Sequence, residues 1–148
     1  MKCTVLTVED KNTWEQFVLR NSPQALFQSW DWGEMQKSLG NTVDRLGYYA
    51  DDSLVGVAQT VVVRAKRGPF LHVRHGPIVQ SATNNIMGSI IEDLTSRARS
   101  QRLLFIRMSP LLADTDNNRQ LLQSSGARSS PIHAMDGEYC WVLDLDKP

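Results

Sequence analysis

Arg74 and His75 are the side chains of this sequence that are best placed for ligand chemistry. Residues 70–73 are predicted to form a strand that Gly76-Pro77 ends, so both side chains directly follow the strand. Ligands of open α/β sheets bind beyond the carboxyl ends of the strands. A guanidinium and an imidazole can both donate hydrogen bonds to a ligand at that point. The sequence therefore predicts a ligand contact at residues 74–77.

Signatures of several enzyme classes are missing. The sequence has no GxSxG nucleophile elbow, HExxH metal motif, CxxC pair or P-loop. Its two cysteines, Cys3 and Cys140, have neither metal-ligand spacing nor a disulfide framework, and we expect free thiols.

Other polar and aromatic residues have simple structural explanations. His72 is expected to form part of the strand's wall, His133 to lie at the surface and Trp14 to lie in the core. Several charged residues are explained as helix caps, turn residues or charges that complement a helix dipole. These are Asp31, Glu34, Asp51, Asp52, Arg97, Arg99 and Arg102. Trp30 and Trp32 are different, because two tryptophans at one helix start exceed what a core position requires.

A strand–helix–strand unit must position residues 74–77. Residues 85–100 carry apolar side chains at helical spacing, including Ile86, Ile90, Leu94 and Ala98. Residues 103–106 are an unbroken apolar run, typical of a strand buried on both faces. With residues 70–73 they predict a right-handed βαβ unit with parallel strands.

A strand at residues 4–8 and two helices are predicted before the central strands. Asp10 can cap the first helix, whose apolar face is formed by Trp14, Phe17 and Val18. The second helix is predicted to begin near Ser29, with Asp31 and Glu34 at capping-box spacing. Its buried face is predicted to carry Trp32, Met35 and Leu39.

Residues 43–50 and 54–64 predict a hairpin around Asp51-Asp52-Ser53. The second arm is apolar on both sides, which places it in the middle of a sheet. A short helix at residues 117–124 and closing strands at 127–133 and 139–145 complete the predicted elements.

Composition limits the classes of function. The 148 residues suffice for one domain with a hydrophobic core. Sixteen basic and sixteen acidic residues cancel, which argues against backbone-driven binding of nucleic acid as the sole function. No apolar run approaches the roughly 20 residues that span a bilayer, and the first residues lack a signal-peptide core. We therefore expect a cytoplasmic protein without a transmembrane segment.

The predicted order β-α-α-β-β-β-α-β-α-β-β is that of a GNAT-like α/β fold, with a mixed central sheet flanked by helices. An acetyl-CoA enzyme of this class should have a glycine-rich turn at the start of the helix after the fourth strand, where backbone N–H groups bind pyrophosphate. Residues 80–85 are Gln-Ser-Ala-Thr-Asn-Asn, without glycine. The sequence therefore argues against acetyl-CoA.

Short motifs occur along the chain in a distinctive order. They are FQSWDWGEMQK at 27–37, LVG at 54–56, RHGP at 74–77, FIRMSP at 105–110 and VLDL at 142–145. The set resembles the Gln-Ser-x-x-Trp helix start, Arg-Gly-Pro loop, Arg-x-Asp-Pro strand end and Leu-Asp-Leu closing strand of the FemABX family. Each motif alone has low specificity, but the set spans nearly the whole chain.

The resemblance implies an aminoacyltransferase that moves an amino acid from charged tRNA onto the stem peptide of a nucleotide-linked or lipid-linked cell-wall precursor. It implies no cofactor. The family has two GNAT-like domains, so residues 1–148 are expected to be a single domain, the N-terminal half of a longer protein. Lys37 matches the basic residue that relatives use near the precursor's diphosphate. The predicted precursor-binding residues are Trp32, Lys37, Arg74 and His75.

Two positions depart from the family pattern. Ser109 stands where the family has an acid before Pro110, so no carboxylate role carries over. His75 stands at the arginine of Arg-Gly-Pro, with Arg74 serving in its place. Catalytic residues therefore stay unassigned, and the isolated chain is expected to be incomplete for catalysis.

Three classes of function remain open. The chain can be one half of a tRNA-dependent aminoacyltransferase, a stand-alone binding module of the same fold, or a small-molecule N-acyltransferase. A second GNAT-like half encoded downstream would favour the first over the second. The missing glycine turn counts against the third.

Overall fold

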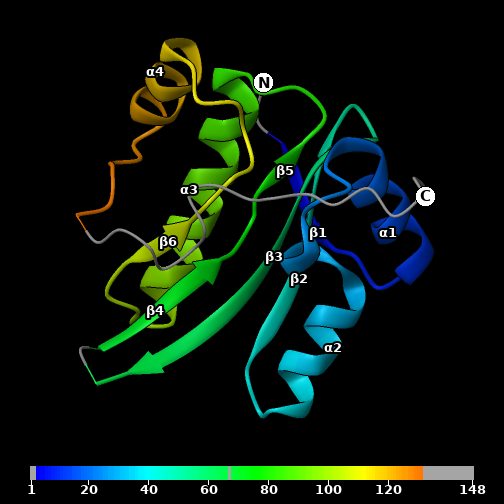
Figure 1. Ribbon diagram of the computed structural model, residues 1–148, viewed down its shortest axis with the longest axis vertical. Helices are drawn as coiled ribbons and strands as arrows, with labels where there is room; N and C mark the ends of the chain where they lie inside the picture. Colours follow the sequence, from blue (N-terminus) through cyan, green and yellow to red (C-terminus); the bar gives the residue numbers. More distant parts are fainter. Residues whose placement is uncertain (1–2, 67, 132–148) are drawn as a thin grey trace, which may run out of the picture.

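The computed structural model describes residues 3–66 and 68–131, which form a mixed sheet with helices on both faces (Figure 1). The strands are β1 (Thr4–Thr7), β2 (Val43–Ala50), β3 (Ser53–Ala65), β4 (Gly68–Val73), β5 (Ile78–Val79) and β6 (Ile106–Met108). The helices are α1 (Lys11–Asn21), α2 (Trp30–Ser38), α3 (Asn84–Ser100) and α4 (Asp116–Ser124), with a 3-10 turn η1 (Leu26–Gln28) before α2. This architecture confirms the predicted α/β class.

The strand order is β1-β2-β3-β4-β6, and β5 pairs with β3 beside this path. β1 to β4 are antiparallel neighbours, whereas β4 and β6 are parallel, as predicted for the βαβ unit. β3 pairs with β5 at residues 56–57 and with β4 at residues 61–65. β4 therefore separates from β3 before residue 74, and residues 58–60 of β3 have no strand partner on that side among the described residues.

Two apolar clusters hold the helices on the sheet. The buried side chains of α3 pack against β2, β3 and β4; they are Met87, Ile90, Leu94 and Ala98. Trp14 and Val18 of α1 form a second cluster with Val57 and Ile78. Figure 1 shows α3 and α4 on one side of the sheet and α1 and α2 on the other.

Local signals start the helices and turn the hairpin as predicted. Asp10 caps α1 by accepting a hydrogen bond from the Thr13 backbone N–H at 2.7 Å. Hydrogen bonds from Thr13 also hold the pKa of the Asp10 carboxyl below its usual value. Asp51 and Asp52 turn the β2–β3 hairpin with φ of 46° and 62°, a region that aspartate tolerates better than most residues. Cys3 is a buried free thiol, also as predicted.

The predicted strand at residues 103–106 is wrong in position and in burial. The strand that pairs with β4 is Ile106–Met108, and Leu104 and Phe105 before it are 66% and 44% exposed. Among the described residues, β6 has β4 as its only strand neighbour. The apolar run at residues 103–105 therefore lies before the strand, and it does not indicate a strand buried on both faces.

The predicted buried face of α2 is also wrong. Met35 and Leu39 are 36% and 67% exposed, and Gly33 is the buried residue of the helix. The N-cap is Ser29, which accepts from the Trp32 backbone N–H, so Asp31 and Glu34 do not form the predicted capping box.

Several predictions fall near the end of the chain. Residues 127–131 form no strand, which contradicts the first part of the predicted closing strand. Residues 132–133 and 139–145, with His133 and Cys140, lie outside the described residues. Within residues 3–66 and 68–131, no helix is long and apolar enough to cross a membrane. The same residues contain no group of three or more His, Cys, Asp or Glu side chains that could hold a metal ion.

Candidate functional site

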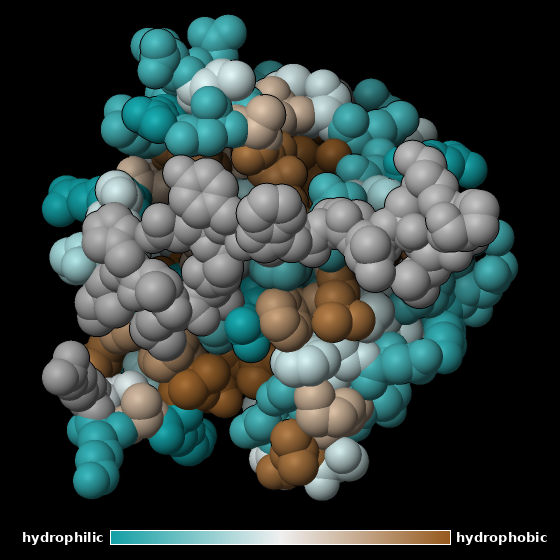
Figure 2. Space-filling model, viewed as in Figure 1, coloured by the Kyte–Doolittle hydropathy of each residue, from teal (hydrophilic) through white to brown (hydrophobic). Residues whose placement is uncertain are grey.

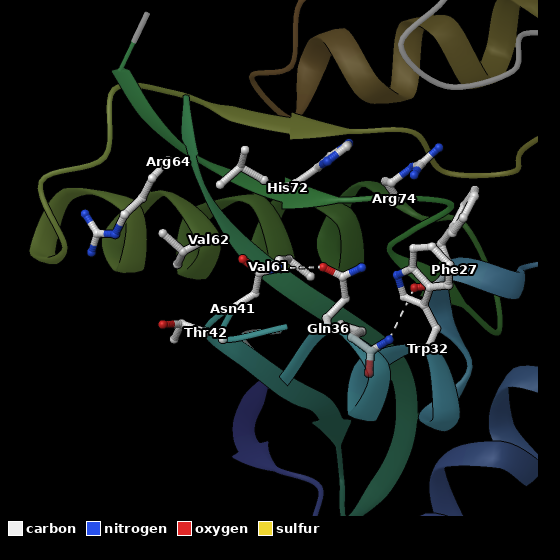
Figure 3. Close-up of a pocket in the computed structure, with 13 residues that line it drawn as sticks. Phe27, Trp32, Gln36, Asn41, Thr42, Val61, Val62, Arg64, His72 and Arg74 are labelled. Atoms are coloured by element: carbon white, nitrogen blue, oxygen red, sulfur yellow. Dashed lines mark hydrogen bonds between the residues drawn. The ribbon is translucent and has the colours of Figure 1, made fainter. Parts of the chain in front are cut away.

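A pocket of about 440 Å³ lies between α2 and the β3–β4 hairpin (Figure 3). Its lining includes Trp32 and Gln36 of α2, three consecutive valines of β3 and His72 of β4. Arg64 and Arg74 also line it, and Figure 3 shows them on either side of His72. Figure 2 shows polar and apolar side chains mixed on this face of the molecule. The site thus combines three valines, several uncharged polar groups and two cations.

Phe27 joins Arg74 to Trp32 at one end of the pocket. The Arg74 guanidinium carbon lies 3.6 Å from the centroid of the Phe27 ring, a cation–π geometry. The Phe27 and Trp32 rings meet edge to face, with centroids 4.6 Å apart. Stacking fixes the plane of the guanidinium at this end of the pocket.

The Phe27 and Trp32 rings form an aromatic wall of the pocket, and Gln28 connects this wall to the sheet. Its side chain is fully buried where β4 has separated from β3. The carboxamide accepts from the Gln59 backbone N–H at 2.7 Å and donates to the Gln59 carbonyl at 3.2 Å, in place of a neighbouring strand. It also donates to the Arg74 carbonyl at 2.7 Å. Gln28 therefore sets the position of the backbone that carries Arg74.

Gly33 lets α2 lie directly on the buried polar groups of β2 and β3. A Cβ at this position would collide with Arg45 and Gln59, coming within 2.8 Å of the Gln59 Cδ. Arg45 donates to the Gln59 side chain at 2.9 Å and to the Trp30 carbonyl at 2.7 Å, and its guanidinium stacks on the Trp30 ring. Trp30 thus holds the buried arginine, while Trp32 faces the pocket.

Lys37 does not line the pocket. Its ammonium pairs with Glu34 at 3.0 Å, and its side chain is 44% exposed. Glu34 also pairs with Arg45 at 2.9 Å. Hydrogen bonds from Lys37 and then Arg45 hold the pKa of the Glu34 carboxyl below its usual value.

His75 lies behind the aromatic wall and is not one of the lining residues. It is 7% exposed, and its ring meets Phe27 edge to face at 4.5 Å. Its backbone N–H donates to the Ser109 Oγ at 2.9 Å. The serine at the position of the family's acid therefore binds the backbone of residue 75.

Of the four residues predicted to share one pocket, Trp32 and Arg74 do so. The binding roles of Trp32, Lys37, Arg74 and His75 remain predictions. Sequence reasoning missed Phe27 and Arg64 as lining residues, although Phe27 lies within the motif at residues 27–37. His72 also lines the pocket, and its expected role as a structural residue of the strand stays a prediction.

Comparisons with known proteins bear on the fold and the family. The model of the FemAB family matches residues 9–135. The crystal structure of FemX matches with a TM-score of 0.73 at 18% identity, covering 83% of this chain and 31% of FemX. This chain therefore spans less than a third of FemX. A comparison with curated proteins gave no match.

Acetyltransferase structures match over nearly their whole length. A probable acetyltransferase has a TM-score of 0.64 at 14% identity, covering 97% of this chain and 99% of its own. Glucosamine-6-phosphate N-acetyltransferase from Arabidopsis thaliana has a TM-score of 0.63 at 10% identity, covering 94% and 100%. These likenesses confirm the predicted GNAT-like fold.

Proposed function

This chain belongs to the FemAB family, as its motifs predicted, and we propose that it binds the amino-acid acceptor of a cell-wall aminoacyltransferase. The acceptor is a nucleotide-linked or lipid-linked peptidoglycan precursor. Aminoacyl-tRNA supplies the amino acid, through a second GNAT-like domain. The reaction takes place in the cytoplasm.

The pocket beside α2 supports this proposal because it combines the groups that such an acceptor needs. Its volume of about 440 Å³ suits part of a small molecule. Arg74, stacked on Phe27, can donate charge-assisted hydrogen bonds to a diphosphate, each worth roughly 1.5–3 kcal/mol. The Trp32 indole offers an apolar face to a base or a sugar.

Lys37 and His75 enter the proposed site in different ways. Lys37 lies outside the lining and is held by a surface ion pair of the kind that contributes little to stability. Its flexible ammonium can exchange Glu34 for a phosphate at small cost. His75 supports the Phe27 ring from behind and so contributes to binding through the aromatic wall.

The start of α3 argues against the alternative of a small-molecule acyltransferase that uses acetyl-CoA. Thr83 caps this helix, and its hydroxyl accepts from the Ile86 backbone N–H. That donor is one of those that a pyrophosphate would need. The second alternative, a stand-alone binding module, uses the same pocket without catalysis, and a second domain encoded downstream would exclude it.

Calorimetric titration of the purified chain with a nucleotide-linked precursor tests the proposal. We expect Arg74→Ala and Lys37→Ala each to weaken binding about tenfold or more, because each removes a charge-assisted bond. Arg119→Ala is the control, since Arg119 is 63% exposed and pairs with Asp114 on the surface. Binding that is absent, or that both variants leave unchanged, would contradict the proposed site.

A further inference from the structure

One end of the molecule, formed by the β3–β4 turn and the end of α3, carries exposed basic side chains. The backbone N–H of Leu104 donates to the Pro69 carbonyl at 2.9 Å, which joins the two segments. Figure 1 shows the turn and the loop after α3 at the same corner of the fold. We call the following residues the basic corner: Arg64, Lys66, Arg99, Arg102 and Leu104, all of them exposed.

Within residues 3–66 and 68–131, no acidic side chain neutralises the positive charge of this corner. The sequence has no acidic residue from 53 to 91 or from 94 to 113. Among the described residues, no acidic side chain forms an ion pair with the four cations. Arg97, one turn earlier in α3, is instead paired with Asp93 at 2.9 Å. A chain with zero net charge thus concentrates positive charge at one end.

An apolar side chain lies among these cations. Leu104 is 66% exposed, and it rests on the turn so closely that a Cβ at Gly68 would collide with it. Cations around an apolar tip are the combination that peripheral membrane proteins present to anionic lipid.

We propose that the basic corner docks this chain on an anionic lipid surface. Each Lys or Arg near such a surface strengthens binding by about fivefold, and the leucine enters the boundary between headgroups and acyl chains. RNA fits this corner less well, because Leu104 has no ring on which a base could stack. The neighbouring Phe105 ring already stacks on Phe70, with centroids 4.7 Å apart, and Arg107 lies 6.0 Å from its centroid.

Docking would also deepen the proposed function. Arg64 belongs both to the basic corner and to the pocket lining, so a bound bilayer would lie beside the proposed acceptor site. That geometry favours a lipid-linked acceptor over a soluble one. This consequence rests on the proposed function, whereas binding to vesicles that contain no precursor does not, so the two can fail separately.

Co-sedimentation of the purified 148-residue chain with vesicles tests the docking. We expect binding to vesicles of phosphatidylcholine and phosphatidylglycerol at low salt, and little binding to phosphatidylcholine alone. The triple variant Lys66→Gln/Arg99→Gln/Arg102→Gln should bind about 100-fold more weakly. Leu104→Ser should weaken binding about tenfold, because it removes the apolar group.

A charge-matched triple variant controls for net charge. Arg20→Gln/Arg119→Gln/Arg128→Gln removes three exposed cations from elsewhere on the chain and should change binding less than about threefold. Equal thermal stability of both triples would show that folding is intact. Equal affinity for the two kinds of vesicle, or equal loss in the two triples, would overturn the proposal. Binding to a short RNA that only the first triple loses, without vesicle binding, would assign the corner to nucleic acid instead.

Discussion

Replacing Gln28 by alanine should strongly destabilise the fold. The side chain is fully buried and makes three hydrogen bonds, to the Gln59 N–H, the Gln59 carbonyl and the Arg74 carbonyl. Among the strands that the structure describes, none takes its place, because β4 and β5 pair with other parts of β3. The variant leaves up to three buried backbone groups without partners.

The expected loss follows from the cost of such groups. A buried donor or acceptor left unsatisfied costs about 1–3 kcal/mol. Partial entry of water would recover some of this, so we expect Gln28→Ala to lower the free energy of unfolding by roughly 3–5 kcal/mol. That is a large part of the ~5–15 kcal/mol that stabilises an ordinary domain.

Urea unfolding followed by tryptophan fluorescence measures the change. Gln16→Ala is the matched control, because Gln16 is exposed on α1 and bonds only to the side chain of Asn12 at 3.3 Å. Its effect should stay within about 0.5 kcal/mol. A loss below ~1 kcal/mol for Gln28→Ala would refute the reasoning that this carboxamide replaces a strand.

Three further predictions follow from the same elements. Gly33→Ala should destabilise the chain by ~3 kcal/mol or more in the same unfolding assay, because its Cβ would collide with the buried Gln59 side chain. Gly88→Ala should instead stabilise α3 by ~0.5–1 kcal/mol, because a Cβ there meets nothing within 4 Å. Because the folded-state pKa of Glu34 is depressed, first by Lys37, its contribution to stability should be present above about pH 4.5 and be lost as pH falls through the lower folded-state pKa. Glu34→Gln should therefore show a flatter acid limb in a pH series of urea unfolding; an unchanged limb would contradict the assignment. Acetyl-CoA should bind no better than weakly in a calorimetric titration, and micromolar affinity would favour an acetyltransferase.

Short-range patterns in the sequence were sufficient to predict several elements. Asp10 caps α1 through its own side chain, and the stripe of α3 repeats over enough turns to specify its buried face. The two aspartates of the β2–β3 turn adopt the left-handed conformation that suits a tight hairpin. Each of these features depends on residues within a few positions of one another, which is why the sequence alone predicts them.

The motif at residues 27–37 could be found in the sequence, but its physical meaning depends on distant residues. Gln28 bonds to β3 and β4, Ser29 caps α2, and Trp32 faces the pocket. The roles of Gln28 and Trp32 need partners about 30 to 46 positions away or a helix already docked on the sheet, whereas the Ser29 cap is local. A motif gives the order of residues without showing which of them contact each other.

By itself, the sequence determined the α/β class, the βαβ unit, the hairpin and membership of the family. Only the tertiary structure decided that α2 turns Gly33 to the sheet, that Lys37 pairs with Glu34, and that Leu104 lies exposed at a basic corner. Helical periodicity identifies side chains that share a face, but it cannot say which face meets the core. At α2 the buried face carries a glycine, which lets the helix approach the buried polar groups of the sheet closely. An apolar stripe at this face would cover those polar groups without giving them hydrogen bonds.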